Sequence, residues 1–256
     1  MTQANDAATA RSPARQSREA GLDALRGFAM IWMAAFHGAF DLNHAGLMTR
    51  QNFYADPFWT GQRTVILSLF LFCAGWALAL RRHRGFDMAF VRRWLQVAGC
   101  ALAVSLGSYV MFPRSFIWFG VLHAMALMLP LTMLLMTLFG QRALLWGLAG
   151  LAVVATPAVL GGFAVFDSRW TGWIGLMTHK PITEDYVPLL PWLGPLWLGL
   201  AVGLFRRQRQ GWSWQTPRWL TPLAGLGRWP LSFYMLHQLV LIGLIEAAVW
   251  LKAEGR

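Results

Sequence analysis

Residues 25–47 read LRGFAMIWMAAFHGAFDLNHAGL, a long apolar stretch that also contains an arginine, an aspartate and two histidines. A helix needs about 20 mostly apolar residues to cross the hydrocarbon core of a bilayer. Six more stretches of this kind follow, at residues 64–80, 94–112, 116–138, 143–166, 186–205 and 229–251. The sequence therefore predicts an all-α integral membrane protein with about seven transmembrane helices.

The composition supports the lipid bilayer as the surrounding solvent. The chain is 57% hydrophobic and only 13% charged, and its net charge of +11 is spread over short connections, so nucleic acid is not an expected partner. Fourteen cationic side chains outside the stretches lie on the side of the N-terminus and seven lie on the opposite side. The positive-inside rule therefore predicts a cytoplasmic N-terminus and a periplasmic C-terminus.

The predicted stretches leave no room for a separate soluble domain. Residues 1–20 are polar and rich in Ala, Arg, Ser and Gln, which predicts a disordered cytoplasmic tail. Residues 21–251 form one transmembrane domain, and residues 252–256 are expected to be a periplasmic tail. The Pro- and Gly-containing segment 216–228 is expected to lie along the inner surface before the last helix.

Three of the predicted helices, 64–80, 94–112 and 143–166, carry no acidic side chain, histidine, lysine or arginine between their flanking arginines and are interpreted as scaffold. Four glycines in these helices suit close helix contacts, namely Gly99, Gly107, Gly147 and Gly150. By contrast, helix 186–205 contains three prolines in its outer half, which is typical of a helix that lines a cavity.

Ionisable groups within the bilayer are costly and are the first place to look for function. Arg26 and His37 are separated by about three helical turns and share one face of helix 25–47, and Asp41 follows one turn later. Asp41 is expected to orient the His37 ring as a general base. Depth along the helices places the other polar residues at two levels. The outer level contains His37, Asp41, His44, Arg63, His123 and Asp185, and the inner level contains Arg26, Arg228 and His237.

Structural roles compete with these functional interpretations. A single membrane histidine such as His123 or His237 often makes only an interhelical hydrogen bond. An arginine at a helix end, such as Arg26, Arg63 or Arg228, can extend its guanidinium group to the lipid headgroups. Its only role can then be to set the orientation of the helix in the membrane. His44 lies near the outer surface and suits an ordinary interfacial residue.

Several segments resemble a known family. Residues 22–28 (LDALRGF), with His37 after Arg26 and ten intervening residues, are similar to the first helix of bacterial membrane proteins related to the heparan-alpha-glucosaminide N-acetyltransferase catalytic domain. The arrangement of Arg26 and His37 also resembles the acyltransferase-3 membrane proteins. Three further segments agree in order with this family: 119–123 (FGVLH), 185–194 (DYVPLLPWLG) and 226–238 (LGRWPLSFYMLHQ).

This resemblance implies transfer of an acyl group, usually acetyl, from cytoplasmic acetyl-CoA or another acyl-CoA to a periplasmic glycan or lipid-linked acceptor, at a bacterial inner membrane. On this hypothesis, Arg26 and Arg228 hold the CoA phosphates, with His237 at the same inner level. His37 with Asp41 is the base or the acyl carrier.

The remaining roles implied by the resemblance lie at the outer level. His123 and Arg63 stabilise the oxyanion, and Asp185 orients acceptor hydroxyls. The resemblance also makes His44 a rival of His37, because the active histidine of the eukaryotic enzyme falls later, in the following loop. The chain lacks that enzyme's additional helices and lumenal domain, so heparan itself is not carried over as substrate.

Two other functions remain open at this stage. A proton-coupled small-solute transporter would also use a proline-broken helix and a His/Asp pair, although no inverted repeat is evident. A b-type haem protein could use His37 and His123 as axial ligands from separate helices. No metal ion is expected, and a second copy of the chain is a candidate partner.

Overall fold

The computed structural model describes residues 19–81, 85–209 and 216–254. The part of residues 1–20 predicted to be a disordered tail lies almost entirely outside this range. The described residues form helices and connections without a β-strand, apart from one isolated bridge between Phe119 and Tyr186. The long helices are α1 (Ala20–His44), α2 (Pro57–Ala79), α3 (Met88–Met111), α4 (Val121–Phe139), α5 (Ala143–Leu160), α6 (Leu189–Gln208) and α8 (Pro230–Glu254). The all-α prediction is confirmed.

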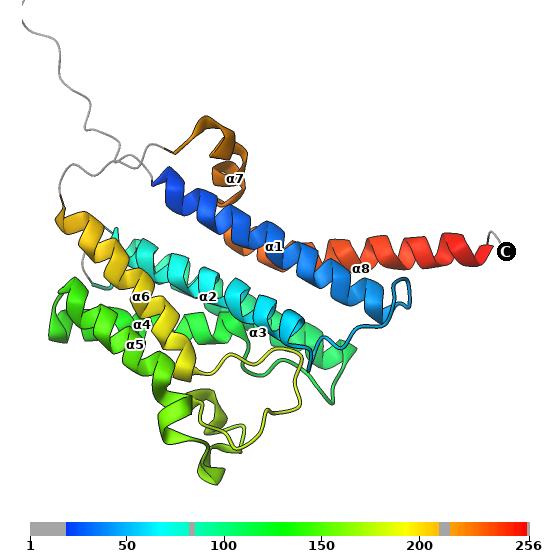
Figure 1. The fold of residues 1–256 in the computed structure, drawn as a ribbon, viewed down its shortest axis with the longest axis horizontal. Helices are drawn as coiled ribbons and strands as arrows, with labels where there is room; N and C mark the ends of the chain where they lie inside the picture. The colour runs from blue at the N-terminus through cyan, green and yellow to red at the C-terminus, as the bar shows by residue number, and fades with distance from the viewer. Residues whose placement is uncertain (1–18, 82–84, 210–215, 255–256) are drawn as a thin grey trace, which may run out of the picture.

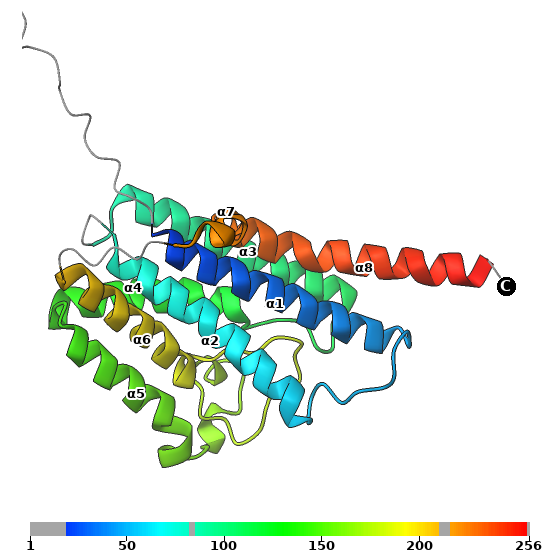
Figure 2. The same ribbon diagram turned by 45° about the horizontal axis from the view of Figure 1, so that its top comes forward.

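Six of these helices, α2 to α6 and α8, are long and apolar enough to cross a membrane. The seventh long helix, α1, has 25 residues, but its charged side chains, which include Asp23, Arg26 and Asp41, lower its mean hydropathy. It lies between α2 and α8 in the same bundle (Figures 1 and 2). The chain is therefore a multi-pass membrane protein in which the most polar long helix is packed against two apolar ones.

Several helix ends differ from the sequence prediction. Helix α4 begins at Val121 rather than at residue 116, because the preceding residues pair with segment 183–187. Helix α5 ends at Leu160, where Gly161 takes a positive φ of 69°. Helix α8 continues to Glu254, three residues into the segment expected to be a tail, while residues 255–256 are outside the described range.

Glycines allow α2, α5 and α6 to pack backbone against backbone. A Cβ atom at Gly75 of α2 would overlap the carbonyl oxygen of Leu196, and one at Gly199 of α6 would overlap that of Phe72. Gly150 of α5 packs against Gly194 of α6 in the same way. The expectation for Gly99 and Gly107 was wrong, because no other helix of the described chain lies within 4 Å of the Cβ position at either residue.

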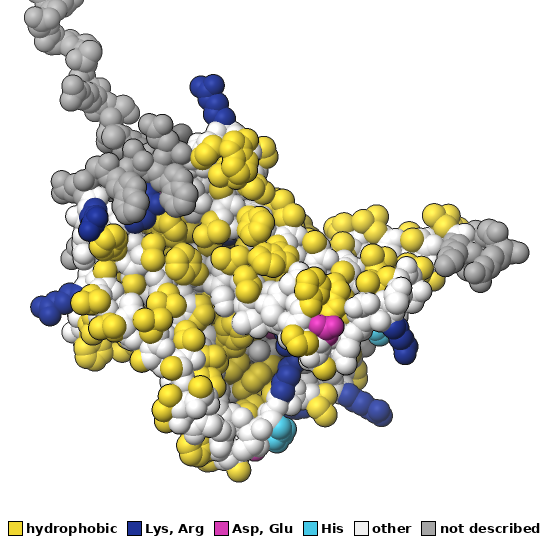
Figure 3. Space-filling model, in the orientation of Figure 1, with side chains coloured by type: hydrophobic (Ala, Val, Ile, Leu, Met, Phe, Trp, Pro, Cys, Tyr) yellow, Lys and Arg dark blue, Asp and Glu magenta, His cyan; other side chains and the backbone are white. Residues whose placement is uncertain are grey.

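The outer faces of the bundle are apolar. Leu102 and Leu106 of α3 and Leu144 and Leu148 of α5 are all exposed, as expected for side chains that face lipid. Figure 3 shows hydrophobic side chains spread over the visible face, with scattered cationic side chains among them and at its edges.

The segment before α8 is folded against α1. It contains a 3₁₀ turn (Arg218–Leu220) and the short helix α7 (Thr221–Leu226). Gly27 of α1 packs against the backbone of Leu223, and Gly227 packs against the backbone of Asp23. Segment 216–228, expected only to lie along the inner surface, therefore docks on α1 and determines where α8 begins.

Candidate functional site

A polar contact fixes the relative depth of α1 and α8. Arg26 Nη1 donates to Asp23 Oδ1 at 3.0 Å and to the carbonyl oxygen of Gly227 at 3.1 Å. The two helices then run side by side in the same direction, and α8 continues beyond the end of α1 (Figures 1 and 2). Arg26 and Gly227 thus mark a common starting level for both helices.

His37 and His237 meet because they are almost equally far from this level. His37 is eleven residues beyond Arg26, and His237 is ten residues beyond Gly227. Their ring centroids are 5.3 Å apart. The prediction that His237 lies at an inner level was wrong, because it measured depth from the predicted end of each helix and did not include the docking of Gly227 on α1.

The hydrogen bonds of His237 define its tautomer. Its Nδ1 lies 2.8 Å from the carbonyl oxygen of Tyr234 and 3.2 Å from that of Phe233. Carbonyl oxygens only accept hydrogen bonds, so Nδ1 is assigned the proton and Nε2 keeps its lone pair. Nε2 is buried and has no hydrogen-bond partner among the described residues. This atom is a proton acceptor inside the bundle.

The His37 ring is half-buried and packs edge-on against Phe36, with a centroid distance of 5.7 Å. Neither of its ring nitrogens hydrogen-bonds to another residue in the described part of the chain. Phe233 stacks on the His237 ring with an interplanar angle of 3°. The two imidazoles are therefore held by aromatic packing and keep ring nitrogens available for a ligand.

Asp41 is bound by α8 rather than by His37. Both of its carboxylate oxygens accept from Gln238 Nε2, at 3.1 Å and 2.8 Å, and within the described residues it makes no hydrogen bond to His37. Gln238 Oε1 is buried without a partner in the same part of the structure. Sequence reasoning included Gln238 in a motif but did not identify it as a site residue, because only the helix pairing shows what it contacts.

His123 belongs to a separate structural cluster. Its Nε2 lies 2.9 Å from Ser105 Oγ, and its Nδ1 accepts from the backbone N–H of Gly120 at 3.3 Å. Ser105 Oγ in turn donates to the carbonyl oxygen of Ile117 at 2.6 Å. Both nitrogens of His123 are thus occupied by protein groups, and the structure does not bring His123 to His37. This geometry disfavours an axial role for His123 in a haem site.

Asp185 fixes the beginning of α4. Its Oδ2 accepts from the backbone N–H of Val121 at 2.8 Å, and the backbone N–H of Val187 donates to the carbonyl oxygen of Phe119 at 3.1 Å. Burial raises the pKa of the Asp185 carboxyl, while its hydrogen bond to Val121 opposes that rise. The two motifs of residues 119–123 and 185–194 therefore hold each other together.

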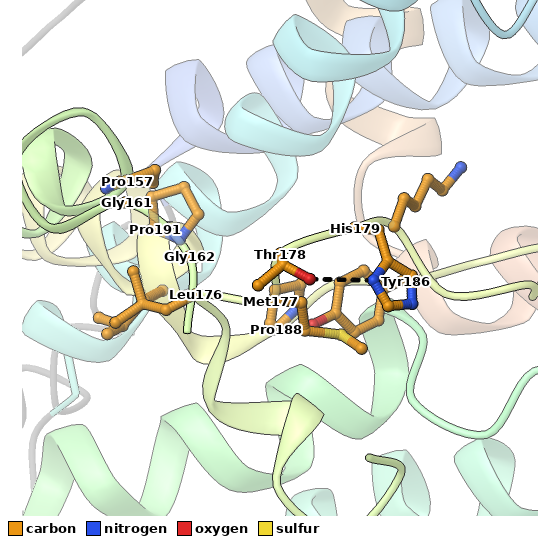
Figure 4. Close-up of a pocket in the computed structure, with 12 residues that line it drawn as sticks. Pro157, Gly161, Gly162, Leu176, Met177, Thr178, His179, Tyr186, Pro188 and Pro191 are labelled. Atoms are coloured by element: carbon orange, nitrogen blue, oxygen red, sulfur yellow. Dashed lines mark hydrogen bonds between the residues drawn. The ribbon is translucent and has the colours of Figure 1, made fainter. Parts of the chain in front are cut away.

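A cavity of about 330 Å³ opens at the same end of the bundle, between the end of α5 and the start of α6 (Figure 4). Its polar lining comes from Thr178, His179, Lys180 and Tyr186. Burial raises the pKa of the Tyr186 phenol to about 12. Partial burial and, second, the nearby positive charge of Arg63 lower the pKa of the Lys180 ammonium. The start of helix 186–205, which its prolines predicted to line a cavity, contributes Tyr186, Pro188 and Pro191. The lining from the α5–α6 connection was not predicted.

The remaining candidates lie at the two ends of α1. His44 is exposed in its last turn. At the other end, Arg26 is largely buried and ion-paired with Asp23, whereas Arg228 is exposed directly after Gly227. In the described part of the chain no group of three or more His, Cys, Asp or Glu side chains could hold a metal ion.

The long apolar helices define a multi-pass membrane protein in which polar side chains of α1 and α8 pack against each other. The family of heparan-alpha-glucosaminide N-acetyltransferase catalytic domains matches residues 18–239, which is nearly the whole chain. The chain belongs to this family, as the resemblance of its motifs indicated. No curated protein and no solved structure shows significant similarity to it.

Proposed function

We propose that this protein is a membrane acyltransferase whose reacting groups lie between α1 and α8. It takes an acyl group, in the first instance acetyl, from acyl-CoA on the side of the N-terminus. It passes this group to a hydroxyl or amine acceptor on the other side. The family match supports acyl transfer, and the observation that carries the residue assignment is the buried, unpartnered Nε2 of His237 beside His37.

His237 is the general base in this proposal. Its Nδ1–H is held by the Tyr234 carbonyl group, so Nε2 can take the proton from the acceptor hydroxyl or amine. The acceptor oxygen or nitrogen then bonds to the acyl carbonyl carbon, the carbon–sulfur bond breaks, and the thiolate of CoA leaves. His37 either contacts the thioester or first carries the acyl group itself.

Asp41 and Gln238 position the acceptor. The amide group of Gln238 donates a hydrogen bond to the Asp41 carboxylate. The Gln238 Oε1 atom remains a hydrogen-bond acceptor without a donor among the described residues. An acceptor substrate with two donor hydrogens, such as an amine or two neighbouring hydroxyls, could donate to Gln238 Oε1 and to His237 Nε2 and so satisfy both buried acceptors. Such a donor-rich substrate suits a sugar or a polar lipid headgroup.

The donor is held at the other end of α1. Arg228 is exposed and contacts a CoA phosphate, whereas Arg26 keeps α1 and α8 in register through Asp23 and Gly227. At the outer end, Arg63 and Lys180 contact the acceptor. Asp185 acts on the site only by holding the first turn of α4, and His123 does so through Ser105.

Membranes that contain the protein should transfer radioactive label from acetyl-CoA to an isolated periplasmic glycan or lipid fraction. We expect transfer to be lost in His237→Ala and strongly reduced in His37→Ala, while His44→Ala retains it. Loss only in His44→Ala would overturn the assignment. Uptake of a solute without any acetyl-CoA-dependent product would instead indicate the transporter function.

A further inference from the structure

A second cavity, of about 540 Å³, lies between the C-terminal ends of α4 and α6, at the opposite end of α6 from the cavity in Figure 4. Its lining includes Met133, Met136, Thr137, Gln141, Leu204 and Arg207. The His37–His237 pair lies on α1 and α8, and neither histidine lines this cavity. The cavity is therefore separate from the site assigned above, and nothing in the proposed reaction uses it.

The walls of this cavity change from apolar to polar along the helix axes. Met133, Met136 and Leu204 are buried and lie within the spanning parts of α4 and α6. Gln141 and Arg207 lie at the ends of those helices, where a bilayer changes from hydrocarbon to headgroups. This order of side chains matches a molecule that has an acyl chain and a polar head.

Arg207 provides a positive charge to this cavity. Its Nη1 donates to the backbone oxygen of Ala79 at 3.2 Å, and within the described residues it forms no ion pair. None of the described residues that line the cavity is acidic. The preceding residue, Arg206, is directed elsewhere, since it pairs with Glu19 at 3.4 Å. The Ala79 carbonyl group thus orients the Arg207 side chain, and the positive charge of Arg207 can still pair with an anionic ligand.

We propose that this cavity binds an anionic phospholipid from the leaflet on the side of the N-terminus. Arg207 contacts the phosphate, the amide of Gln141 contacts the headgroup, and one acyl chain lies along Met133, Met136 and Leu204. A lipid is favoured over a soluble phosphate because the cavity adjoins the last turn of α4, where Leu138 and Phe139 are exposed to the bilayer.

Native mass spectrometry of the full chain released from mixed micelles tests this site. Phosphatidylglycerol should bind more tightly than phosphatidylcholine with the same acyl chains, and Arg207→Gln should reduce that preference about fivefold, as expected for one interfacial arginine. The matched control is Arg50→Gln, at an exposed arginine in the α1–α2 connection, which should keep the preference.

A second variant tests the same cavity without changing Arg207, in case Arg207→Gln fails to fold. Met136→Trp narrows the apolar part of the cavity without changing charge, and it should weaken binding of both lipids equally. Equal binding of the two lipids by the native chain, or an unchanged preference in Arg207→Gln, would overturn the proposal. Displacement of the lipid by soluble glycerol phosphate at similar concentration would also overturn it, in favour of a water-soluble ligand.

Discussion

The α2–α6 pair and the α1–α8 pair are both contacts between long helices, but they are built from different groups. The first is joined through glycines, with Gly75 and Gly199 placing backbone directly against backbone. The second is joined through side chains, with aromatic rings, imidazoles and an Asp41–Gln238 hydrogen bond between the helices. A glycine interface leaves no room for a ligand, whereas a side-chain interface with unpaired acceptors can admit one.

The two pairs also differ in how much of each helix the protein covers. In α6, 44% of the membrane-spanning window is buried, whereas none of the corresponding window of α8 is. Helix α8 is held mainly by α1 and by the docked α7 segment. The α2–α6 pair is therefore the more deeply packed of the two, and the α1–α8 pair, which holds the groups of the proposed reaction, lies at the edge of the bundle.

The largest expected effect is on the reaction itself. His237→Ala removes the proposed base and should reduce acetyl transfer by about 10²- to 10⁴-fold while the thermal unfolding temperature changes little. Val240→Ala, at an exposed position less than one turn away on α8, is the matched control and should keep full transfer. Loss of transfer in both variants would indicate that α8 as a whole, rather than His237, had been disturbed.

The next effect is on stability and concerns the glycine interface. Gly75→Ala adds a methyl group that overlaps the Leu196 carbonyl oxygen, so α2 and α6 must separate, at a cost of roughly 1–3 kcal/mol in the free energy of unfolding. Gly99→Ala makes the same change where no other helix is near, and should be neutral or slightly stabilising. Thermal unfolding in detergent measures both, and equal behaviour would contradict the distinction drawn between the glycines.

A smaller effect is expected from the Asp41–Gln238 contact. Gln238→Leu removes the amide that donates to both carboxylate oxygens, which leaves the half-buried Asp41 carboxylate without that partner. Acetyl transfer should fall about tenfold, through a higher KM for the acceptor rather than for acetyl-CoA. Gln238→Asn keeps the amide on a shorter side chain and should recover part of the loss. A change in the KM for acetyl-CoA alone would contradict a role on the acceptor side.

The smallest effect concerns the outer cationic residues. Because Arg63 helps to lower the pKa of Lys180, Arg63→Gln should raise that pKa and leave a smaller neutral fraction of the amine at any given pH. Labelling of Lys180 by an amine-reactive reagent near pH 8 should then slow by a few-fold, as measured by mass spectrometry of peptides. Lys252, the other lysine of the chain, provides the internal reference. Unchanged labelling would show that Arg63 does not act on Lys180.

The sequence was sufficient for the fold class because hydropathy acts locally, residue by residue. It was insufficient for the pairing of polar residues, which depends on how helices are docked. His37 was found from its own helix, but its neighbour His237 was assigned to the wrong level, since the docking of Gly227 on α1 is a long-range contact. Gln238 could not be distinguished from other polar residues for the same reason.

The helix contacts of the glycines could not be predicted from the sequence either. Gly99 and Gly150 occur in similar apolar surroundings, yet only Gly150 meets another helix, because sequence spacing does not tell which face of a helix is turned toward a neighbour. Likewise, His123 and His37 both appear in the sequence as histidines within predicted membrane helices. Only the contact with Ser105 reveals that His123 serves the local structure.

Because Arg26 contacts Gly227, the number of residues from Arg26 to His37 must remain close to the number from Gly227 to His237 if the two rings are to meet. Inserting one residue between Arg26 and His37 would move that ring by about 1.5 Å and turn it by about 100° around the helix axis, away from His237. The same holds for an insertion between Gly227 and His237. Natural length variation in proteins built this way should therefore accumulate in connections such as 161–188, while these two intervals stay constant or change together.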